Sequence, residues 1–228
     1  MKKVKVATVG LCALTMVGMG CSTKAGTGAL IGTGSGTAVG ALIGALAGNT
    51  AVGAAVGAAV GAGAGALIGK HMDKVAAETA AQVKNGKVEE VTDANGLKAV
   101  KVTFDNGILF PVGKYALQAA AKNELSKFSN VLKNNADLQV DIQGYASSDG
   151  SNEVNQVLSN NRANSVKAYL VNTCGVPSSQ IKSARGFGET NLITNADGTE
   201  NVKASRRVEV YLYASQAMID KANAGKLN

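Results

Sequence analysis

The chain has 228 residues, enough for one or two domains, and a formal net charge of +7 at neutral pH. Three lysines lie within the first five residues, and if they leave with a signal peptide the charge falls from +7 to +4. This modest charge argues against a nucleic-acid partner. The only histidine is His71, and without a second histidine we expect neither a His/Cys metal site nor Ser/His or Cys/His catalysis. We therefore expect no metal, no cofactor and no enzymatic activity.

The N-terminus has the pattern of a secretory signal. The basic residues at 2–5 are followed by an apolar run over 6–20. At about 15 residues, this run is short for a hydrocarbon core of about 30 Å. We therefore predict a cleaved signal peptide over residues 1–20.

The end of the apolar run resembles a lipobox. Small residues stand just before Cys21 in the stretch VGMGCS, although Gly18 occupies a position where such sequences usually carry leucine. The resemblance implies a lipidated N-terminus over 21–25, in which a diacylglyceryl thioether and an N-acyl chain such as palmitate on Cys21 anchor the protein. Ser22, rather than aspartate, after the cysteine implies the outer membrane. The alternative is ordinary signal cleavage, with Cys21 unmodified.

Residues 26–69 contain no charged side chain, and glycine recurs there at every fourth position. Two series are separated by Asn49-Thr50. They comprise Gly28, Gly32, Gly36, Gly40, Gly44 and Gly48, then Gly53, Gly57, Gly61, Gly65 and Gly69. Because residues four apart share a helix face, each series predicts a helix with a glycine groove that allows close packing.

Each series is about 20 residues long, or roughly 30 Å of helix. We therefore predict a glycine-zipper helical hairpin over 26–69, and the segment resembles glycine-zipper regions of bacterial envelope proteins. The alternative is a flexible Gly/Ala linker. The pattern leaves open whether the hairpin spans a membrane, forms a homo-oligomer or does both.

The remainder of the chain has the pattern of a mixed α+β domain. Residues 70–97 are predicted to be a helical linker and the entry to the domain, with a short amphipathic helix over 72–83. Period-2 alternation predicts strands over 100–104, 138–142, 181–187 and 207–213, and apolar residues at helical spacing predict helices over 117–132 and 153–171. The predicted order is β-α-β-α-β-β over 98–214, and residues 215–228 are predicted to be a C-terminal tail.

Three motifs in this domain occur in an order that can be compared with known families. The first comprises GYASSDG at 144–150 and LSNNRA at 158–163, the second is RGFGE at 185–189, and the third is RRVEV at 206–210. In this order they resemble the OmpA-like C-terminal domain family over residues 98–214. Together with the lipobox and the glycine repeat, the chain is similar to the YiaD type of lipoprotein within that family.

The resemblance implies non-covalent binding of the peptidoglycan stem peptide through its diaminopimelate residue. The free end of that residue carries an ammonium and a carboxylate, which call for an acid beside an arginine fork. The family motif implies that Arg162 is the arginine, whereas Ser147 stands where family members carry the acid. We expect Asp149 to be a surrogate acid, with Ser147 and Asn155 as neutral hydrogen-bonding groups.

The two adjacent arginines of the last motif offer a further contact. Because side chains alternate along a strand, one of Arg206 and Arg207 should face the site, and we favour Arg207. Tyr145 is expected in the core or the groove wall. Glu189 is interpreted as structural because no second carboxylate opposes it. Cys174 is left without an intramolecular partner, and we expect a partly buried, inert thiol.

These features predict an outer-membrane lipoprotein that links the outer membrane to the cell wall, with its soluble domain in the periplasm. Its expected partners are peptidoglycan, outer-membrane lipid and other copies of itself. The alternative is a membrane-inserted oligomeric structural or stress protein that acts through the hairpin, with weak or absent wall binding.

Overall fold

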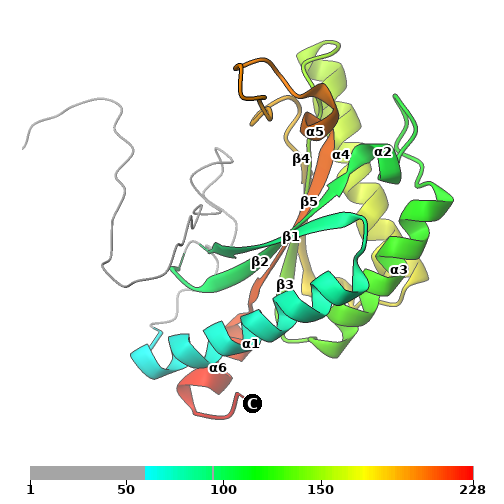
Figure 1. Cartoon of the computed structure of the whole chain (residues 1–228). Helices are drawn as coiled ribbons and strands as arrows, with labels where there is room; N and C mark the ends of the chain where they lie inside the picture. The colour runs from blue at the N-terminus through cyan, green and yellow to red at the C-terminus, as the bar shows by residue number, and fades with distance from the viewer. Residues whose placement is uncertain (1–59, 94, 228) are drawn as a thin grey trace, which may run out of the picture. The chain divides into compact units, whose positions relative to one another are not determined.

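The computed structural model describes residues 60–93 and 95–227 (Figure 1). The helices are α1 (Ala62–Gln82), α2 (Asn106–Leu109), α3 (Ala119–Asn134), α4 (Asn152–Ala168), α5 (Val202–Ser205) and α6 (Gln216–Asn223). The strands are β1 (Gly86–Thr92), β2 (Lys98–Asp105), β3 (Leu138–Gly144), β4 (Ile181–Gly186) and β5 (Arg207–Ala214). The predicted signal peptide, Cys21 and the glycine series as far as Gly57 lie outside the described residues, so they remain predictions.

The five strands form one sheet in the order β1-β2-β5-β3-β4. All neighbouring pairs are antiparallel except β3 and β4, which run parallel and are joined through α4. A parallel pair needs a crossover connection, and a helix is the usual one. The predicted α+β class is confirmed, as are the four predicted strands and the two long helices of the domain.

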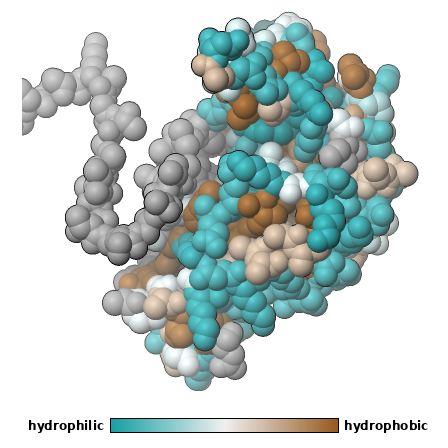
Figure 2. Space-filling view, in the orientation of Figure 1, coloured by the Kyte–Doolittle hydropathy of each residue, from teal (hydrophilic) through white to brown (hydrophobic). Residues whose placement is uncertain are grey.

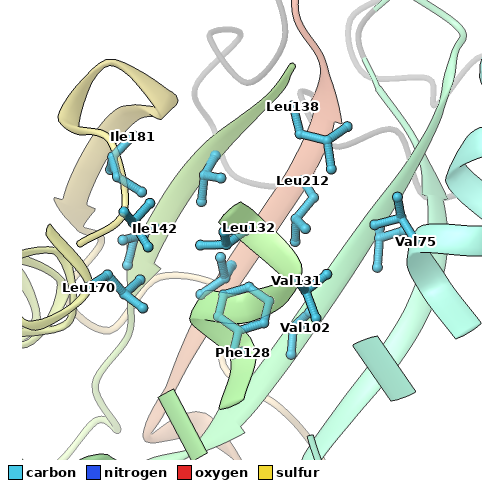
Figure 3. Packing of buried hydrophobic residues seen from close by; sticks show 14 of the residues in the cluster. Val75, Val102, Phe128, Val131, Leu132, Leu138, Ile142, Leu170, Ile181 and Leu212 are labelled. Atoms are coloured by element: carbon cyan, nitrogen blue, oxygen red, sulfur yellow. The ribbon is translucent and has the colours of Figure 1, made fainter. Parts of the chain in front are cut away.

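The main core lies between the helices and one face of the sheet. Alternate side chains of the strands point toward Phe128, Val131 and Leu132 of α3, as Figure 3 shows for Ile142 and Leu212. Phe104 of β2 meets Phe128 edge-on, with ring centroids 5.8 Å apart. Burial of each such side chain contributes about 1.5–3 kcal/mol, so this layer holds the helices in place.

The structure differs from prediction at both ends of the domain. The helix expected to start at residue 72 starts at Ala62, and Ala64, Ile68 and Met72 are buried along one side of it. The segment expected to be a tail contains α6, whose Met218 is buried. Since α1 and α6 pack together, as they also lie in Figure 1, both belong to the domain. The last glycines of the second series therefore lie in a helix of the domain.

β1 was not predicted. Its sequence, GKVEEVT, has adjacent charged residues that interrupt the alternation of apolar and polar positions. The strand lies at the edge of the sheet, where long charged side chains are common. Glu89 of β1 pairs with Lys101 of β2 at 2.9 Å. Pairing with a neighbour, rather than its own pattern, makes this segment a strand.

None of the helices within 60–93 and 95–227 is both long enough and apolar enough to span a bilayer. Seen from the side of Figure 1, the surface is mainly hydrophilic, with hydrophobic residues gathered in small areas (Figure 2). Among the described residues, a Cβ added at Gly65 or Gly69 would meet nothing within 4 Å, so no helix of this part of the chain packs closely on these two glycines.

Candidate functional site

A pocket of about 470 Å³ opens at the end of the sheet where β3 gives way to α4. Four segments line it: α2 with the loop after it, the loop after β3, the first half of α4, and α5 with the residue that follows it. In Figure 1, α2, α4 and α5 gather at one end of the sheet, away from α1 and α6. The lining contains four of the five predicted site residues, namely Ser147, Asp149, Asn155 and Arg162.

Two glycines bring α4 close enough to the sheet to form the pocket wall. A Cβ at Gly144 would lie 2.2 Å from the carbonyl oxygen of Ser159, and one at Gly186 would lie 2.1 Å from the backbone nitrogen of Asn160. Neither distance is sterically allowed, so only glycine permits this approach. The first turn of α4 is capped by Ser151, whose hydroxyl accepts from the backbone N–H of Val154 at 3.3 Å.

Arg162 of α4 is the most deeply buried cation of the pocket. It is 2% exposed, its Nε donates to the carbonyl oxygen of Lys114 at 3.0 Å, and its guanidinium lies 5.5 Å from the centre of the Phe110 ring. Burial, reinforced by the charge of Arg206, lowers the pKa of Arg162 to about 10. The side chain is still protonated at neutral pH, and an incoming anion would offset both effects.

Ser147, Asp149 and Arg206 form a connected group on another wall of the pocket. The Nε of Arg206 donates to the Ser147 hydroxyl at 2.9 Å, and its Nη2 forms an ion pair with Asp149. The Ser147 hydroxyl donates in turn to Asp149 at 3.3 Å. The Asp149 side chain is 63% exposed, so the group lies at the mouth of the pocket. The expected surrogate acid is thus present beside Ser147, and it already has a cationic partner.

Asn155 holds the loop after β3 in position. Its side chain is buried, and its Nδ2 donates to the carbonyl oxygen of Ser147 at 3.1 Å and to Glu189 at 2.9 Å. Glu189 therefore has the structural role that was expected for it. Asn155 lines the pocket, but its amide N–H groups serve the loop.

Arg207 is not in the pocket lining, so the geometry does not support its selection from the sequence. It is 5% exposed, donates to Glu209 at 2.7 Å, and lies 3.9 Å from the ring centre of Tyr145. Tyr145 is itself buried and stacks on Phe187, which confirms its expected place in the core. The neighbouring Arg206, which lies between α5 and β5, is the arginine that reaches the pocket.

Sequence reasoning also missed the apolar lining. Val154 of α4 is 60% exposed and lines the pocket with Leu158. Phe110 and Val112 come from the loop after α2, a segment without a recognisable motif. Among the lining residues that sequence reasoning missed, only Arg206 had a usable signal, namely the pair of adjacent arginines at 206 and 207.

The charges of the lining are unbalanced. Arg162, Lys203 and Arg206 are basic, whereas Asp149 is the acidic residue among those that line the pocket. Such an excess of positive charge in a partly apolar recess favours an anionic ligand with an aliphatic part. Among the described residues, no cluster of histidine, cysteine, aspartate or glutamate could hold a metal ion. Cys174, also in this part of the chain, is half-buried and free.

Comparison with known families explains this arrangement. Residues 109–207 match the OmpA family, and residues 31–76 match the glycine zipper family. The chain carries an OmpA family domain. Both resemblances that were drawn from the motifs are therefore confirmed, and neither family is one of enzymes.

Curated relatives match the chain through the OmpA family domain. The protein named Probable lipoprotein YiaD of Escherichia coli (strain K12) is 33% identical over 111 residues, which cover 49% of this chain and 50% of the relative. Outer membrane protein A of Serratia marcescens is 36% identical over 109 residues, which cover 46% of this chain and 30% of the relative. The chain thus spans half or less of the length of these two relatives.

Solved structures support the fold of the same region. A MotB-like protein from Desulfovibrio vulgaris superimposes with a TM-score of 0.54 at 18% identity, over 66% of this chain and 99% of that one. The periplasmic domain of Helicobacter pylori MotB gives a TM-score of 0.50 at 17% identity, over 62% of this chain and 90% of that one. At these identities the similarity concerns the fold alone.

Proposed function

We propose that this protein is an outer-membrane lipoprotein whose OmpA family domain binds peptidoglycan non-covalently and so links the outer membrane to the cell wall. The observation that carries the proposal is the buried Arg162 in a pocket with excess positive charge. The names of the relatives, an outer membrane protein and a lipoprotein, support the location.

In this proposal, the ligand is a carboxylate of the peptidoglycan stem peptide. Arg162 receives it, because a guanidinium fixed through Nε by the Lys114 carbonyl and placed over Phe110 is already oriented for a planar anion. The methylene groups of the ligand contact Val154 and Leu158. Ser147, Asn155 and Asp149 remain the candidate contacts for the rest of the stem peptide.

Sedimentation with purified sacculi tests wall binding. Arg162→Lys keeps the charge but loses the planar fork, and the loss of one charge-assisted hydrogen bond predicts binding about tenfold weaker or more. Lys167→Ala is the matched control, because Lys167 is a cation of the same helix that does not line the pocket. The proposal is wrong if the wild type stays in the supernatant, or if Arg162→Lys sediments as well as the wild type.

The lipid anchor is proposed at Cys21 after cleavage of residues 1–20. Cys21→Ser should abolish incorporation of labelled palmitate and move the protein from the membrane fraction to the soluble fraction, because a serine hydroxyl cannot form the thioether. Cys174→Ser is the control and should leave the protein in the membrane fraction. Equal palmitate labelling of wild type and Cys21→Ser would contradict the anchor.

A second candidate function is assembly through the glycine zipper, which the match over residues 31–76 favours. Deletion of this segment separates the two functions, but the deletion must stop before α1, since Ala64 and Ile68 are buried in the domain. Removal of 26–59 should leave sedimentation with sacculi intact if the domain binds the wall. If the hairpin is responsible, the same deletion should abolish both oligomers, seen by cross-linking, and wall association.

A further inference from the structure

We infer that Arg206 neutralises the acidic side of the pocket. The pocket then recognises a carboxylate of its ligand and not an ammonium group of its ligand. This inference rests on the proposed function and concerns the chemistry that the site recognises. It assigns Arg206 the role of a specificity-determining residue.

The first support is the geometry of the group at the mouth of the pocket. Asp149 is the acid of the lining, and Ser147 is the neutral acceptor beside it. Arg206 donates to both, through Nε to the Ser147 hydroxyl at 2.9 Å and through Nη2 to Asp149. A ligand ammonium would need these same acceptors, since it can only donate hydrogen bonds. The hydrogen bonds from Ser147 and Arg206 to Asp149 both use Oδ2, so an ammonium that reached the other oxygen would lie beside the guanidinium charge of Arg206.

The second support is the charge of the remaining lining. With Asp149 paired to Arg206, basic side chains still outnumber acidic ones in the lining, although Lys203 pairs with Asp105 from outside it at 3.6 Å. Burial and the like charge of Arg206 both disfavour the protonated form of Arg162. A carboxylate relieves this repulsion, whereas an ammonium increases it. The pocket therefore attracts one end of a zwitterion and not the other.

The residue at position 147 determines how many acids the loop offers. An aspartate at 147 would give two acids on the loop, one for Arg206 and one for a ligand ammonium. Ser147 leaves a single acid, and an arginine from the end of α5 neutralises it. The site keeps the means to bind a carboxylate and loses a free acceptor for a cation.

Two small dicarboxylates test the inference on the full mature chain in detergent micelles. Diaminopimelate and pimelate share the same carbon chain and both carboxylates, but only the first carries ammonium groups. NMR titration of the wild type should give dissociation constants within about threefold of each other. In Arg206→Gln the ratio should change by about tenfold in favour of diaminopimelate, because Asp149 is released for a charge-assisted hydrogen bond.

Lys203→Gln is the matched control. It removes one positive charge from the lining without freeing Asp149, because Lys203 lies near Asp105 at 3.6 Å. It should weaken both ligands equally and leave the ratio unchanged. Ser147→Asp is a second variant that does not depend on removing Arg206, and the added acid should also shift the ratio about tenfold toward diaminopimelate.

The outcomes separate this inference from the proposed function. A wild type that prefers diaminopimelate by tenfold or more contradicts the role of Arg206, as do unchanged ratios in both Arg206→Gln and Ser147→Asp. Sedimentation with sacculi but no binding of either dicarboxylate also contradicts it, while wall binding stands. If the wild type binds neither dicarboxylate and does not sediment with sacculi, the proposed function fails as well.

Discussion

The adjacent residues Arg206 and Arg207 lie in two regions with opposite uses of charge. Arg206 is partly exposed at the mouth of the pocket, where its partner Asp149 is 63% exposed. Arg207 is buried with Glu209 beneath the pocket end of the sheet, and both side chains are less than 10% exposed. A ligand can thus reach the charge of Arg206, whereas the charge of the adjacent Arg207 is buried in an ion pair of the folded domain.

The two ion pairs are expected to differ in their contributions to stability and to ligand binding. A buried ion pair is costly to break because the remaining charge is stranded, whereas an exposed pair contributes little to stability. Glu209 also accepts from the hydroxyl of Tyr211, and burial together with this carboxylate raises the pKa of that tyrosine. The Arg207 region is therefore expected to govern unfolding, and the Arg206 region ligand choice.

The two arginines should differ strongly in their effect on the free energy of unfolding. Arg207→Ala strands the Glu209 carboxylate and should lower the free energy of unfolding by about 3–5 kcal/mol. Arg206→Ala should lower it by about 1 kcal/mol or less, because its pair is exposed. Urea unfolding followed by circular dichroism measures both variants. Equal losses of stability would erase the distinction between the regions.

The next effect tests how closely the pocket depends on the fold. Gly186→Ala places a methyl group against the backbone of Asn160 and should cost about 1–3 kcal/mol or more, since backbone must move. It should also weaken sedimentation with sacculi, because α4 carries Arg162. Gly198→Ala is the control, for its Cβ would meet nothing within 4 Å and only its positive φ of 84° opposes the change. Unaltered binding by Gly186→Ala would show that the pocket tolerates a displaced α4.

The smallest effect concerns a region far from both arginines. Gly65→Ala in α1 should raise the free energy of unfolding by about 0.5–1 kcal/mol, because alanine favours the helix and the added Cβ meets nothing. Sedimentation with sacculi should not change. A drop in stability would instead indicate that a second helix packs on this glycine in the intact protein.

Sequence reasoning was sufficient for the parts of the fold whose own pattern determines them. The strands β2, β3, β4 and β5 and the helices α3 and α4 follow from alternation and helical spacing. β1 was missed because pairing with β2 makes it a strand, and residues 62–69 were predicted to be helical as part of the hairpin and not as the start of α1. Both depend on tertiary contacts that a local pattern does not contain.

The same limit applies to the site. Arg162, Ser147, Asp149 and Asn155 were found through a family motif, and the structure brings them to one pocket. The choice between Arg206 and Arg207 required knowing which side of β5 faces the pocket, and Phe110 and Val112 come from a loop with no motif. Orientation across the sheet, rather than residue type, was the missing information.

The most direct test of wall binding at this pocket observes the arginines themselves. Full-length mature protein labelled with ¹⁵N at arginine can be titrated with a soluble stem peptide, while the Nε–H resonances are followed by NMR. Large shifts are expected for Arg162 and Arg206, and a much smaller shift for Arg207. A shift confined to Arg207, or none at a peptide concentration that displaces the protein from sacculi, would contradict wall binding at this pocket.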